Sequence, residues 1–513
     1  MCPRTAFACL VLLGLAFGLA RGLNDLPSLD GRTRSTAIGA GGDTRIGRAI
    51  DPRLAAHPGL SGIHALTDAR DAFAARMLLA DAAERSLDVQ YYIWRRDMSG
   101  SLLFGALSRA ADRGVRVRLL LDDHGTAGLD EILADLDAHP DIEIRLFNPV
   151  GIRRPRLLGY LTDFPRLNRR MHNKSFTADN QVTIIGGRNV GDEYFDATQD
   201  VAFVDLDVMA IGPVVQAVSN DFDRYWASDS SYPVEALLAP GHFADFASAI
   251  APVERDPSAA AYLEATRDSP FVHRMLQGDL ELDWADTRMV SDDPAKVLGR
   301  SEPETNLFPR MTAILGEPVA ELQLVSPYFV PTAAGVEWFA AAARRGVKIM
   351  VLTNSLEATD VAAVHAGYAK RRRPLLEAGI TLYESRRRRG DAEPRHRTGF
   401  SGSSDTSLHA KTFAVDGLRV FVGSFNFDPR SAHLNTELGF VIDSAAMARE
   451  IAIAFDRRVP AIAYDVRLAP SGELYWLERR DGQVLRTNVE PGTGFWQRAG
   501  VRLLSMLPIE RLL

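Results

Sequence analysis

Residues 171–189 read "MHNKSFTADNQVTIIGGRN", and residues 408–426 read "LHAKTFAVDGLRVFVGSFN". In both segments a lysine follows a histidine by two residues, an aspartate follows the lysine by five, and a glycine-rich stretch then ends in asparagine. The two histidines, His172 and His409, are separated by nearly half the length of the 513-residue chain. Repetition of one pattern at this separation indicates two copies of a structural unit.

The repeat extends beyond these segments. Residues 86–94 are rich in β-forming side chains, 99–114 have helical spacing and end at Gly114, and 115–123 form a second β-rich stretch. The same order recurs at 321–330, 334–346 and 347–355. A strand, a helix and a second strand in this order join parallel neighbours of one sheet. The sequence therefore predicts two similar α/β domains.

Within each copy of the motif, two short β-rich stretches flank a turn dipeptide typical of hairpins, Asp179-Asn180 and Asp416-Gly417. Alternate residues of a strand point to one face, so we expect the histidine and the lysine of each copy to share a face. The closing asparagine follows the returning strand and is expected near that face. Asp179 and Asp416 are predicted to be structural turn residues that do not contact substrate.

The residue types of the motif fit a phosphate site. A lysine ammonium and an asparagine amide donate hydrogen bonds to phosphoryl oxygens, and glycines allow close approach of the backbone. With a pKa near 6.5, one histidine can be a neutral nucleophile while the other is a protonated acid. The candidate catalytic residues of the two copies are His172, Lys174, Asn189, His409, Lys411 and Asn426, with Gly187 and Ser424 as candidate contacts of the substrate phosphate.

The sequence predicts no metal and no other cofactor. Lys174 and Lys411 stand where a metal site would need a second histidine or a carboxylate, and an ammonium group repels a cation. Cys2 and Cys9 are the two cysteines of the chain. A disulfide framework or a cysteine-based zinc site in the folded body is therefore excluded.

The two motifs resemble the HxKxxxxD…G(G/S)xN motifs of the phospholipase D superfamily. The similarity extends over most of the chain beyond about residue 56 and is greatest to the bacterial cardiolipin synthase C branch. The segments that carry it include "LDVQYYIW", "RGVRVRLLLDD", "FVDLDVMAIGP", "SPYFVPTAAGVEW" and "GSFNFDPRSAHLNTELGFVI". The resemblance implies two phospholipase D-like α/β domains, each a mixed sheet flanked by helices, that form one active site with pseudo-twofold symmetry.

The resemblance also implies a transfer in two steps. By analogy His172 attacks the phosphodiester to form a phosphohistidine, and His409 protonates the leaving alcohol and then deprotonates the incoming one. The motifs are nearly equivalent, so the sequence does not decide which histidine attacks. In the family a carboxylate downstream of each motif orients a histidine. Glu437 matches this position after the second motif, and Asp205, with Asp200 as its competitor, after the first.

The expected function is that of a phosphatidyltransferase that makes cardiolipin from phosphatidylglycerol and a second phospholipid. The family allows phosphatidylglycerol or phosphatidylethanolamine as the second lipid, and the residues select neither. Two histidines alone permit other acceptors and substrates. A phospholipase D hydrolase that releases phosphatidic acid and, less favoured, a phosphodiesterase nuclease therefore remain alternatives.

The ends of the chain suggest contact with a membrane. The apolar run 6–20 predicts a signal peptide or short anchor at 1–22, because it is shorter than the roughly 20 residues of a spanning helix. Residues 495–513 mix apolar side chains with arginines, as in an interfacial helix, although packing on the body is an equal alternative. We expect a bacterial inner-membrane protein, peripheral or anchored by this leader, with the periplasmic face as an option.

The expected partner is an anionic phospholipid surface. Basic runs lie at 153–174, 368–374 and 385–390, and the first contains interleaved apolar residues that favour lipid over nucleic acid. No nucleic acid and no obligate protein partner is expected. The predicted division of the chain is 1–22 leader, 23–56 flexible linker, 57–275 first domain, 276–470 second domain, and 471–513 C-terminal hairpin and amphipathic tail.

Overall fold

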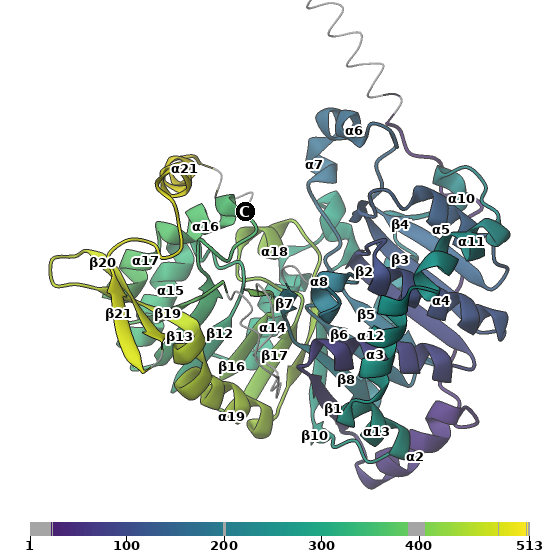
Figure 1. The fold of residues 1–513 in the computed structure, drawn as a ribbon, viewed down its shortest axis with the longest axis horizontal. Helices are drawn as coiled ribbons and strands as arrows, with labels where there is room; N and C mark the ends of the chain where they lie inside the picture. The colour runs from purple at the N-terminus through teal and green to yellow at the C-terminus, as the bar shows by residue number, and fades with distance from the viewer. Residues whose placement is uncertain are drawn as a thin grey trace, which may run out of the picture.

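The computed structural model describes residue 22 and residues 24–198, 202–387, 406–480, 482–508 and 510. These residues form two halves that lie side by side, each built on one large sheet (Figure 1). The leader predicted at 1–22 falls outside them apart from residue 22. Among the described residues, no helix has both the length and the apolar character needed to cross a membrane.

The first half contains a nine-stranded mixed sheet with the order β10-β1-β8-β6-β5-β2-β3-β4-β9. Its strands are β1 (Ser61–Leu66), β2 (Ser86–Ile93), β3 (Arg116–Gly125), β4 (Ile142–Phe147), β5 (Ser175–Ala178), β6 (Val182–Gly186), β8 (Asp207–Ile211), β9 (Ser231–Pro233) and β10 (Asp283–Ala285). The strands β2, β3 and β4 are parallel, and the other pairings are antiparallel. The predicted unit of strand, helix and strand is therefore the parallel core of this sheet.

Local sequence explains the helix that joins β2 to β3. The helix α4 (Met98–Asp112) begins after Asp97, whose carboxylate accepts the backbone N–H of Gly100 at 3.0 Å. It ends before Gly114, whose φ of 86° lies in the left-handed region that glycine adopts without strain. The capping residue and this glycine fix both ends of the crossover.

The second half repeats the arrangement in a ten-stranded sheet with the order β11-β18-β17-β16-β12-β13-β14-β19-β20-β21. Its strands are β11 (Thr287–Ser291), β12 (Glu321–Val325), β13 (Lys348–Asn354), β14 (Thr381–Ser385), β16 (Thr412–Val415), β17 (Arg419–Gly423), β18 (Leu438–Ile442), β19 (Ala463–Leu468), β20 (Leu474–Arg480) and β21 (Gln483–Thr487). The central order matches that of the first sheet, and the crossover helix α15 (Thr332–Arg344) corresponds to α4. The predicted fold class, two similar α/β domains with mixed sheets, is confirmed.

Apolar side chains hold the two halves together. One buried cluster joins strands of both sheets through Ile63, Ile185, Val208, Val420, Val422 and Phe440. The short strands β7 (Ala202–Val204) and β15 (Thr406–Leu408) pair in parallel across the halves. The chain passes from the first sheet to the second at Asp286, between β10 and β11.

One connecting segment differs from the expectation. Residues 23–56, predicted to be a flexible linker, contain the helix α2 (Arg45–Ala56), and the Arg32 guanidinium donates to the carbonyls of Ser228 and Ser231 at 2.6 and 2.9 Å. The alanine- and proline-rich stretch from Tyr232 to about Pro270, within the predicted first domain, forms helices that pack on the first half. These helices are α11 (Phe243–Glu254), α12 (Pro257–Arg267) and α13 (Pro270–Gln277). Buried apolar residues such as Phe246 and Tyr262, too widely spaced to mark a helix clearly, hold them there.

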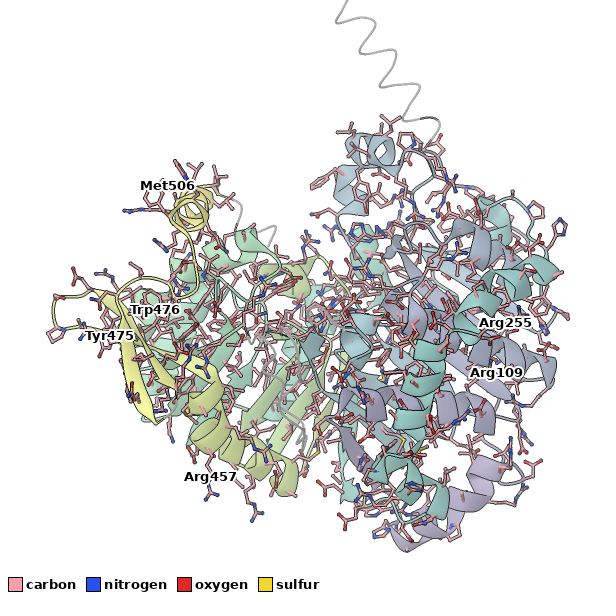
Figure 2. All side chains as sticks on the ribbon, in the orientation of Figure 1. Arg109, Arg255, Arg457, Tyr475, Trp476 and Met506 are labelled. Carbon is pink, nitrogen blue, oxygen red and sulfur yellow. The ribbon has the colours of Figure 1, made fainter. Side chains whose placement is uncertain are left out.

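The C-terminal hairpin, β20 and β21, continues the second sheet from β19 and is not a separate unit. After it the helix α21 (Phe495–Ser505) packs on α16 (Ala362–Ala369) through Val501 and Leu504. The remaining apolar side chains of this segment stay exposed, and Figure 2 shows Met506 at the outer edge of the molecule. Both readings of the tail, packing and exposure, thus apply to different faces of one helix.

Candidate active site

Each motif is built around a tight hairpin, β5–β6 in the first half and β16–β17 in the second. All four turn residues have φ between 52° and 64°, as the paired Asx and glycine dipeptides allow. The Asp179 carboxylate accepts the backbone N–H groups of residues 84, 85 and 86, and Asp416 accepts those of residues 319, 320 and 321. Each aspartate thereby ties its hairpin to the start of the neighbouring strand.

The histidine and the lysine of each motif do not lie within a strand. The expected strand begins only at Ser175 in β5 and at Thr412 in β16, one residue after the lysine. His172 and His409 instead pair with the opposite half of the molecule. Their local strand pattern could not reveal this pairing, because the partner is more than 200 residues away.

His172 is held by the second half. Its backbone N–H donates to the carbonyl of Thr436 at 2.8 Å, and its ring Nδ1 lies 2.8 Å from Oε2 of Glu437. Both contacts come from consecutive residues, so the backbone pairing delivers the carboxylate to the ring. With Nδ1 engaged, Nε2 is the ring nitrogen left for a substrate.

His409 is held in the same way by the first half. Its N–H donates to the carbonyl of Val204 at 2.8 Å, and its Nδ1 lies 2.6 Å from Oδ2 of Asp205. The two halves therefore exchange carboxylates, and each histidine depends on the other domain. Asp200, the competitor of Asp205, lies outside the described residues.

The two carboxylates have different surroundings. Glu437 accepts the hydroxyls of Ser424 at 2.5 Å and Ser431 at 2.8 Å. Asp205 accepts the backbone N–H of Leu206 at 2.8 Å, and a Cβ at Gly187 would lie 2.1 Å from its Oδ1. Ser424 and Gly187 occupy equivalent places in the motif, so one half gives its carboxylate a hydroxyl where the other leaves room for it. That these two residues also contact a substrate phosphate stays a prediction.

The electrostatics of the two pairs differ accordingly. Burial raises the pKa of Glu437 to about 7, although Lys174 and the two serine hydroxyls oppose the rise. Burial also acts to raise the pKa of Asp205, but His409 and the nearby cations outweigh it and hold that pKa well below its usual range. At neutral pH Asp205 is therefore ionised, whereas Glu437 titrates.

Burial lowers the pKa of both histidines, and the two lysines add to the effect. The pKa of His172 falls well below 6.5, because burial, Lys174 and Lys411 all disfavour its protonated form. The pKa of His409 is lowered by burial and by Lys411, but the Asp205 carboxylate acts in the opposite direction. Of the two rings, His409 is thus the better supported as a cation.

The lysines turn back toward their own histidines. Lys174 Nζ donates to the backbone carbonyl of His172 at 2.6 Å, and Lys411 Nζ donates to that of His409. Lys411 Nζ also lies 3.1 Å from Nδ1 of the His409 ring. Burial lowers the pKa of both ammonium groups, and the carboxylates Glu437 and Asp205 oppose that shift.

The two asparagines are not equivalent. Asn189 is tied to the protein on both sides of its amide, since Oδ1 accepts the N–H of Ile93 at 3.1 Å and Nδ2 donates to the Tyr194 hydroxyl at 3.0 Å. Asn426 has a buried Oδ1 that accepts no hydrogen bond from a described group. Both asparagines follow the hairpins of their motifs, and the Asn189 amide is held by the protein through its oxygen and through its nitrogen.

Aromatic rings complete the site and were not anticipated from the sequence. The Tyr92 ring meets the His172 ring edge-on with centroids 5.0 Å apart. Tyr194 and Phe203 contact the His409 ring with centroids 5.3 and 5.1 Å away. The β-rich pattern of residues 86–94 predicts a strand there, but it does not indicate that Tyr92 contacts a histidine far away in the sequence.

Many of the arginines in the basic runs have partners within the protein. Arg153 pairs with Asp123 at 2.7 Å and Arg372 with Glu384 at 2.7 Å. Glu510 near the C-terminus binds Lys370 at 3.1 Å and Arg371 at 2.8 Å. These runs hold helices and the tail in place, which leaves fewer free cations for a nucleic acid backbone. The part of the run at 385–390 beyond residue 387 lies outside the described residues.

In the described ranges, no group of three histidine, cysteine, aspartate or glutamate side chains is arranged to hold a metal ion. The candidate site consists of imidazole, ammonium, amide and carboxylate groups. Such a donor set can bind a phosphodiester anion and move protons at its oxygens.

Comparison with known proteins agrees with this chemistry. A family model described as "Cardiolipin synthase, PLD-like domain" matches twice, at residues 78–226 and 311–459. The chain therefore belongs to the cardiolipin synthase family of proteins with phospholipase D-like domains, and the predicted family is confirmed.

Particular relatives extend the match over most of the chain. It is 51% identical to cardiolipin synthase C of Escherichia coli strain K12 over 91% of this chain and 100% of that protein. It is 30% identical to an uncharacterized protein of Helicobacter pylori strain 26695, over 91% of this chain and 93% of the relative. The crystal structure of phosphatidylserine synthase from Haemophilus influenzae Rd KW20 shares the fold, with a TM-score of 0.56 at 13% identity over 92% of this chain and 100% of that one.

Proposed function

We propose that the protein is a phosphatidyltransferase that makes cardiolipin from phosphatidylglycerol and a second phospholipid, either phosphatidylglycerol or phosphatidylethanolamine, through a phosphohistidine intermediate. The observation that carries the proposal is the exchange of Glu437 and Asp205 between the halves, which gives two histidines of unequal acidity in one site. The similarity to cardiolipin synthase C along that protein's whole length supports the choice of product.

In the first step, Nε2 of neutral His172 attacks phosphorus of the donor lipid. A P–N bond forms, the P–O bond to the headgroup alcohol breaks, and the proton of the His409 imidazolium passes to the leaving oxygen. The low pKa of His172 keeps its lone pair available, and ionised Asp205 supports the cation at His409. A bound phosphodiester anion adds a negative charge that favours this imidazolium further.

In the second step, neutral His409 takes the proton of the incoming hydroxyl. The alcohol oxygen attacks phosphorus, the P–N bond breaks, and His172 regains its neutral form. Lys174, Lys411 and Asn426 would donate to the phosphoryl oxygens while charge builds up on them. Asn189, whose amide already has two protein partners, would then position Ile93 and Tyr194 around the site.

The same residues can use water as the acceptor, so the surface around the site decides between transfer and hydrolysis. Exposed apolar side chains lie on the short helices α6 (Arg156–Thr162) and α7 (Phe164–Leu167), on α21 and at the residue after α21. They include Leu157, Leu161, Phe164, Phe495, Trp496, Leu503 and Met506. Trp496 is 83% exposed, which is unusual for a residue of this size in contact with water alone.

The helices that carry these side chains, α6 and α7 in the first half and α21 in the second, lie on the same side of the molecule (Figure 1). Together they fit a peripheral protein that rests on a phospholipid surface, with Arg502 exposed beside the apolar residues of α21. The proposed location is the bacterial inner membrane, and these surfaces support a peripheral contact with lipid. A lipid surface supplies lipid alcohols at high local concentration, which favours transfer over hydrolysis.

The test is mass spectrometry of the products formed in vesicles of phosphatidylglycerol, with and without phosphatidylethanolamine. Cardiolipin formed in vesicles of phosphatidylglycerol alone shows that phosphatidylglycerol can serve as the second lipid. Cardiolipin formed only when phosphatidylethanolamine is present identifies phosphatidylethanolamine as the second lipid. Phosphatidic acid as the sole product would replace the transferase by a hydrolase. Cleavage of single-stranded DNA with no lipid product would point to a nuclease, and the His172→Ala and His409→Ala variants exclude a contaminating activity.

A further inference from the structure

An exposed carboxylate lies beside the second half of the site. Tyr328 follows β12, and its hydroxyl is 2.8 Å from each carboxylate oxygen of Asp360, which follows β13. Tyr328 is half-buried and Asp360 is exposed. The tyrosine fixes the carboxylate, while the remaining lone pairs of Asp360 face outward for another donor.

Hydrogen bonds connect both residues to the second motif. The Ser326 hydroxyl donates to the carbonyl of Tyr328 at 2.6 Å and accepts the N–H of Phe427 at 2.9 Å, next to Asn426. The carbonyl of Ala358, two residues before Asp360, accepts the hydroxyl of Ser407 at 2.8 Å. Ser407 is two residues before His409, so the pair is positioned by the same segments that carry the motif.

Electrostatic effects agree with this placement. Burial lowers the pKa of Lys411, and Asp360 is among the carboxylates that oppose the lowering. Burial raises the pKa of Tyr328 well above 10, and Asp360, Tyr194 and Tyr92 add to the rise. Tyr328 therefore lies within electrostatic range of the rings that contact both histidines and remains a hydrogen-bond donor.

A carboxylate at this place is unfavourable for the phosphodiester itself, because like charges repel. It is favourable for a neighbouring group that donates hydrogen bonds. In the proposed reaction, attack by His172 requires the leaving oxygen to lie on the opposite side of phosphorus, toward His409. The headgroup alcohol leaves on that side, and the incoming alcohol arrives there.

We propose that Asp360, held by Tyr328, binds the polar headgroup of the lipid alcohol that leaves or enters at His409. Its free lone pairs accept a hydrogen bond from the hydroxyl of a glycerol headgroup or from the ammonium of an ethanolamine headgroup. Asp360 is a specificity-determining residue, and Tyr328 is its positioning residue. The inference rests on the proposed function, since it assigns a headgroup to one side of that reaction.

The test compares Asp360→Asn and Tyr328→Phe with the wild-type protein in two vesicle mixtures. One contains phosphatidylglycerol alone, and the other contains isotopically labelled phosphatidylethanolamine as well, so that the donor of each phosphatidyl group is identified by mass. Glu337→Gln is the matched control, because Glu337 is an exposed acid of the same domain on α15. Melting temperatures of all variants check that the fold is retained.

For Asp360→Asn we expect KM to rise about tenfold with kcat less affected, as for loss of a hydrogen bond to a charged group. A loss confined to the labelled lipid identifies the ammonium as the partner, and an equal loss in both mixtures identifies the hydroxyl. Tyr328→Phe should change the same parameter in the same direction by a smaller factor.

Unchanged KM and donor preference in Asp360→Asn, or changes no larger than in Glu337→Gln, would overturn the inference. A fall in kcat alone, with KM and preference retained, would also overturn it, because a headgroup contact acts on binding. If the wild-type protein forms no cardiolipin in either mixture, the proposed function fails instead, and the two failures are distinguishable.

Discussion

The two halves of the site use the same motif but not the same acid and base balance. His172 is paired with Glu437, whose pKa burial raises to about 7, and His409 with Asp205, whose pKa its cationic surroundings hold low. A duplicated site with identical halves would give two histidines of equal basicity. A reaction that needs a nucleophile and an acid at the same pH is better served by unequal halves.

The two carboxylates differ in length, and the motif residue that each one contacts differs with it. The longer glutamate meets a serine hydroxyl from Ser424, and the shorter aspartate approaches Gly187 so closely that a Cβ would collide with it. In the second half, neutral serine hydroxyls donate hydrogen bonds to Glu437. In the first half, Asp205 interacts mainly with charged groups, His409 and Lys411. The half with serine at this motif position, Ser424, has the longer carboxylate, Glu437. The half with glycine there, Gly187, has the carboxylate that is one methylene shorter, Asp205.

The largest expected effect separates the roles of the histidines. With phosphatidyl-p-nitrophenol, whose leaving group needs no acid, His409→Ala should release one equivalent of p-nitrophenol per protein and retain a phosphatidyl group on the enzyme. His172→Ala should release none. Turnover of ordinary lipids should fall by about 10⁴-fold or more in both. Intact mass measured at alkaline pH, where phosphohistidine persists, detects the adduct.

The exposed residue His242 offers a control for loss of an imidazole, since His242→Ala removes one far from the motif in sequence. If the burst and the adduct appear in His172→Ala and not in His409→Ala, the halves have the opposite roles. Full turnover in either motif variant would refute the mechanism with two histidines.

The next effect compares the carboxylates. Asp205→Asn should lower kcat about 10³-fold, because it removes the ionised partner of the histidine that must carry a proton. Glu437→Gln should cost only about 10- to 100-fold, since one amide oxygen can still accept from the ring and from the Ser424 hydroxyl, which both contact Oε2. Steady-state kinetics on mixed micelles at neutral pH give both values. Equal losses would mean that the two pairs work alike despite their different surroundings.

A reciprocal exchange of the motif residues tests the steric part of the comparison. Gly187→Ser should displace Asp205, because its Cβ would lie 2.1 Å from Oδ1, and should lower kcat about 100-fold. Ser424→Gly removes one hydroxyl from Glu437 and should cost about 1 kcal/mol of stability and a smaller part of the activity. Gly187→Ala is the control for the hydroxyl and should behave like Gly187→Ser. Wild-type activity in Gly187→Ser and Gly187→Ala would show that the close approach of Asp205 to residue 187 is not needed for catalysis.

The smallest effect concerns stability against pH. The pKa of Asp205 is depressed in the folded protein, so its contribution is present above its ordinary pKa and is lost as pH falls. The pKa of Glu437 rises from 4.5 to about 7, so its contribution is present below 4.5 and is lost as pH rises through 7. Relative to the wild-type protein, Asp205→Asn should therefore be most destabilised near neutral pH, and Glu437→Gln near pH 4 to 5.

Differential scanning calorimetry at several pH values between about 4 and 8 measures these differences of a few degrees. Slopes of the same sign for both variants would contradict the assigned pKa directions. The comparison is internal, so other titrating groups cancel between each variant and the wild-type protein.

The parts of the fold that local sequence encodes were predictable. The units of strand, helix and strand, the duplicated order and the hairpin turns at Asp179 and Asp416 appear where their patterns placed them. Two predictions failed for want of such patterns. Residues 23–56 are predicted to be a flexible linker, yet α2 and Arg32 bind this segment to the first domain. The histidine and the lysine of each motif are expected on a strand, yet both precede it.

The sequence by itself determined the chemistry available to this protein: two imidazoles, two ammonium groups and two amides, each set held beside a tight turn. Only the tertiary structure decided which carboxylate pairs with which histidine. The Met171–Thr436 bridge between the domains brings Glu437 to His172. The pairing of β7 with β15 brings Asp205 to His409. Turns and strand periodicity depend on neighbouring residues and leave a local signal. The pairing of each histidine with a carboxylate depends on the packing of apolar surfaces that are far apart in the chain. The pKa of each paired group depends on the resulting burial. Local sequence therefore indicates neither the pairing nor the pKa values.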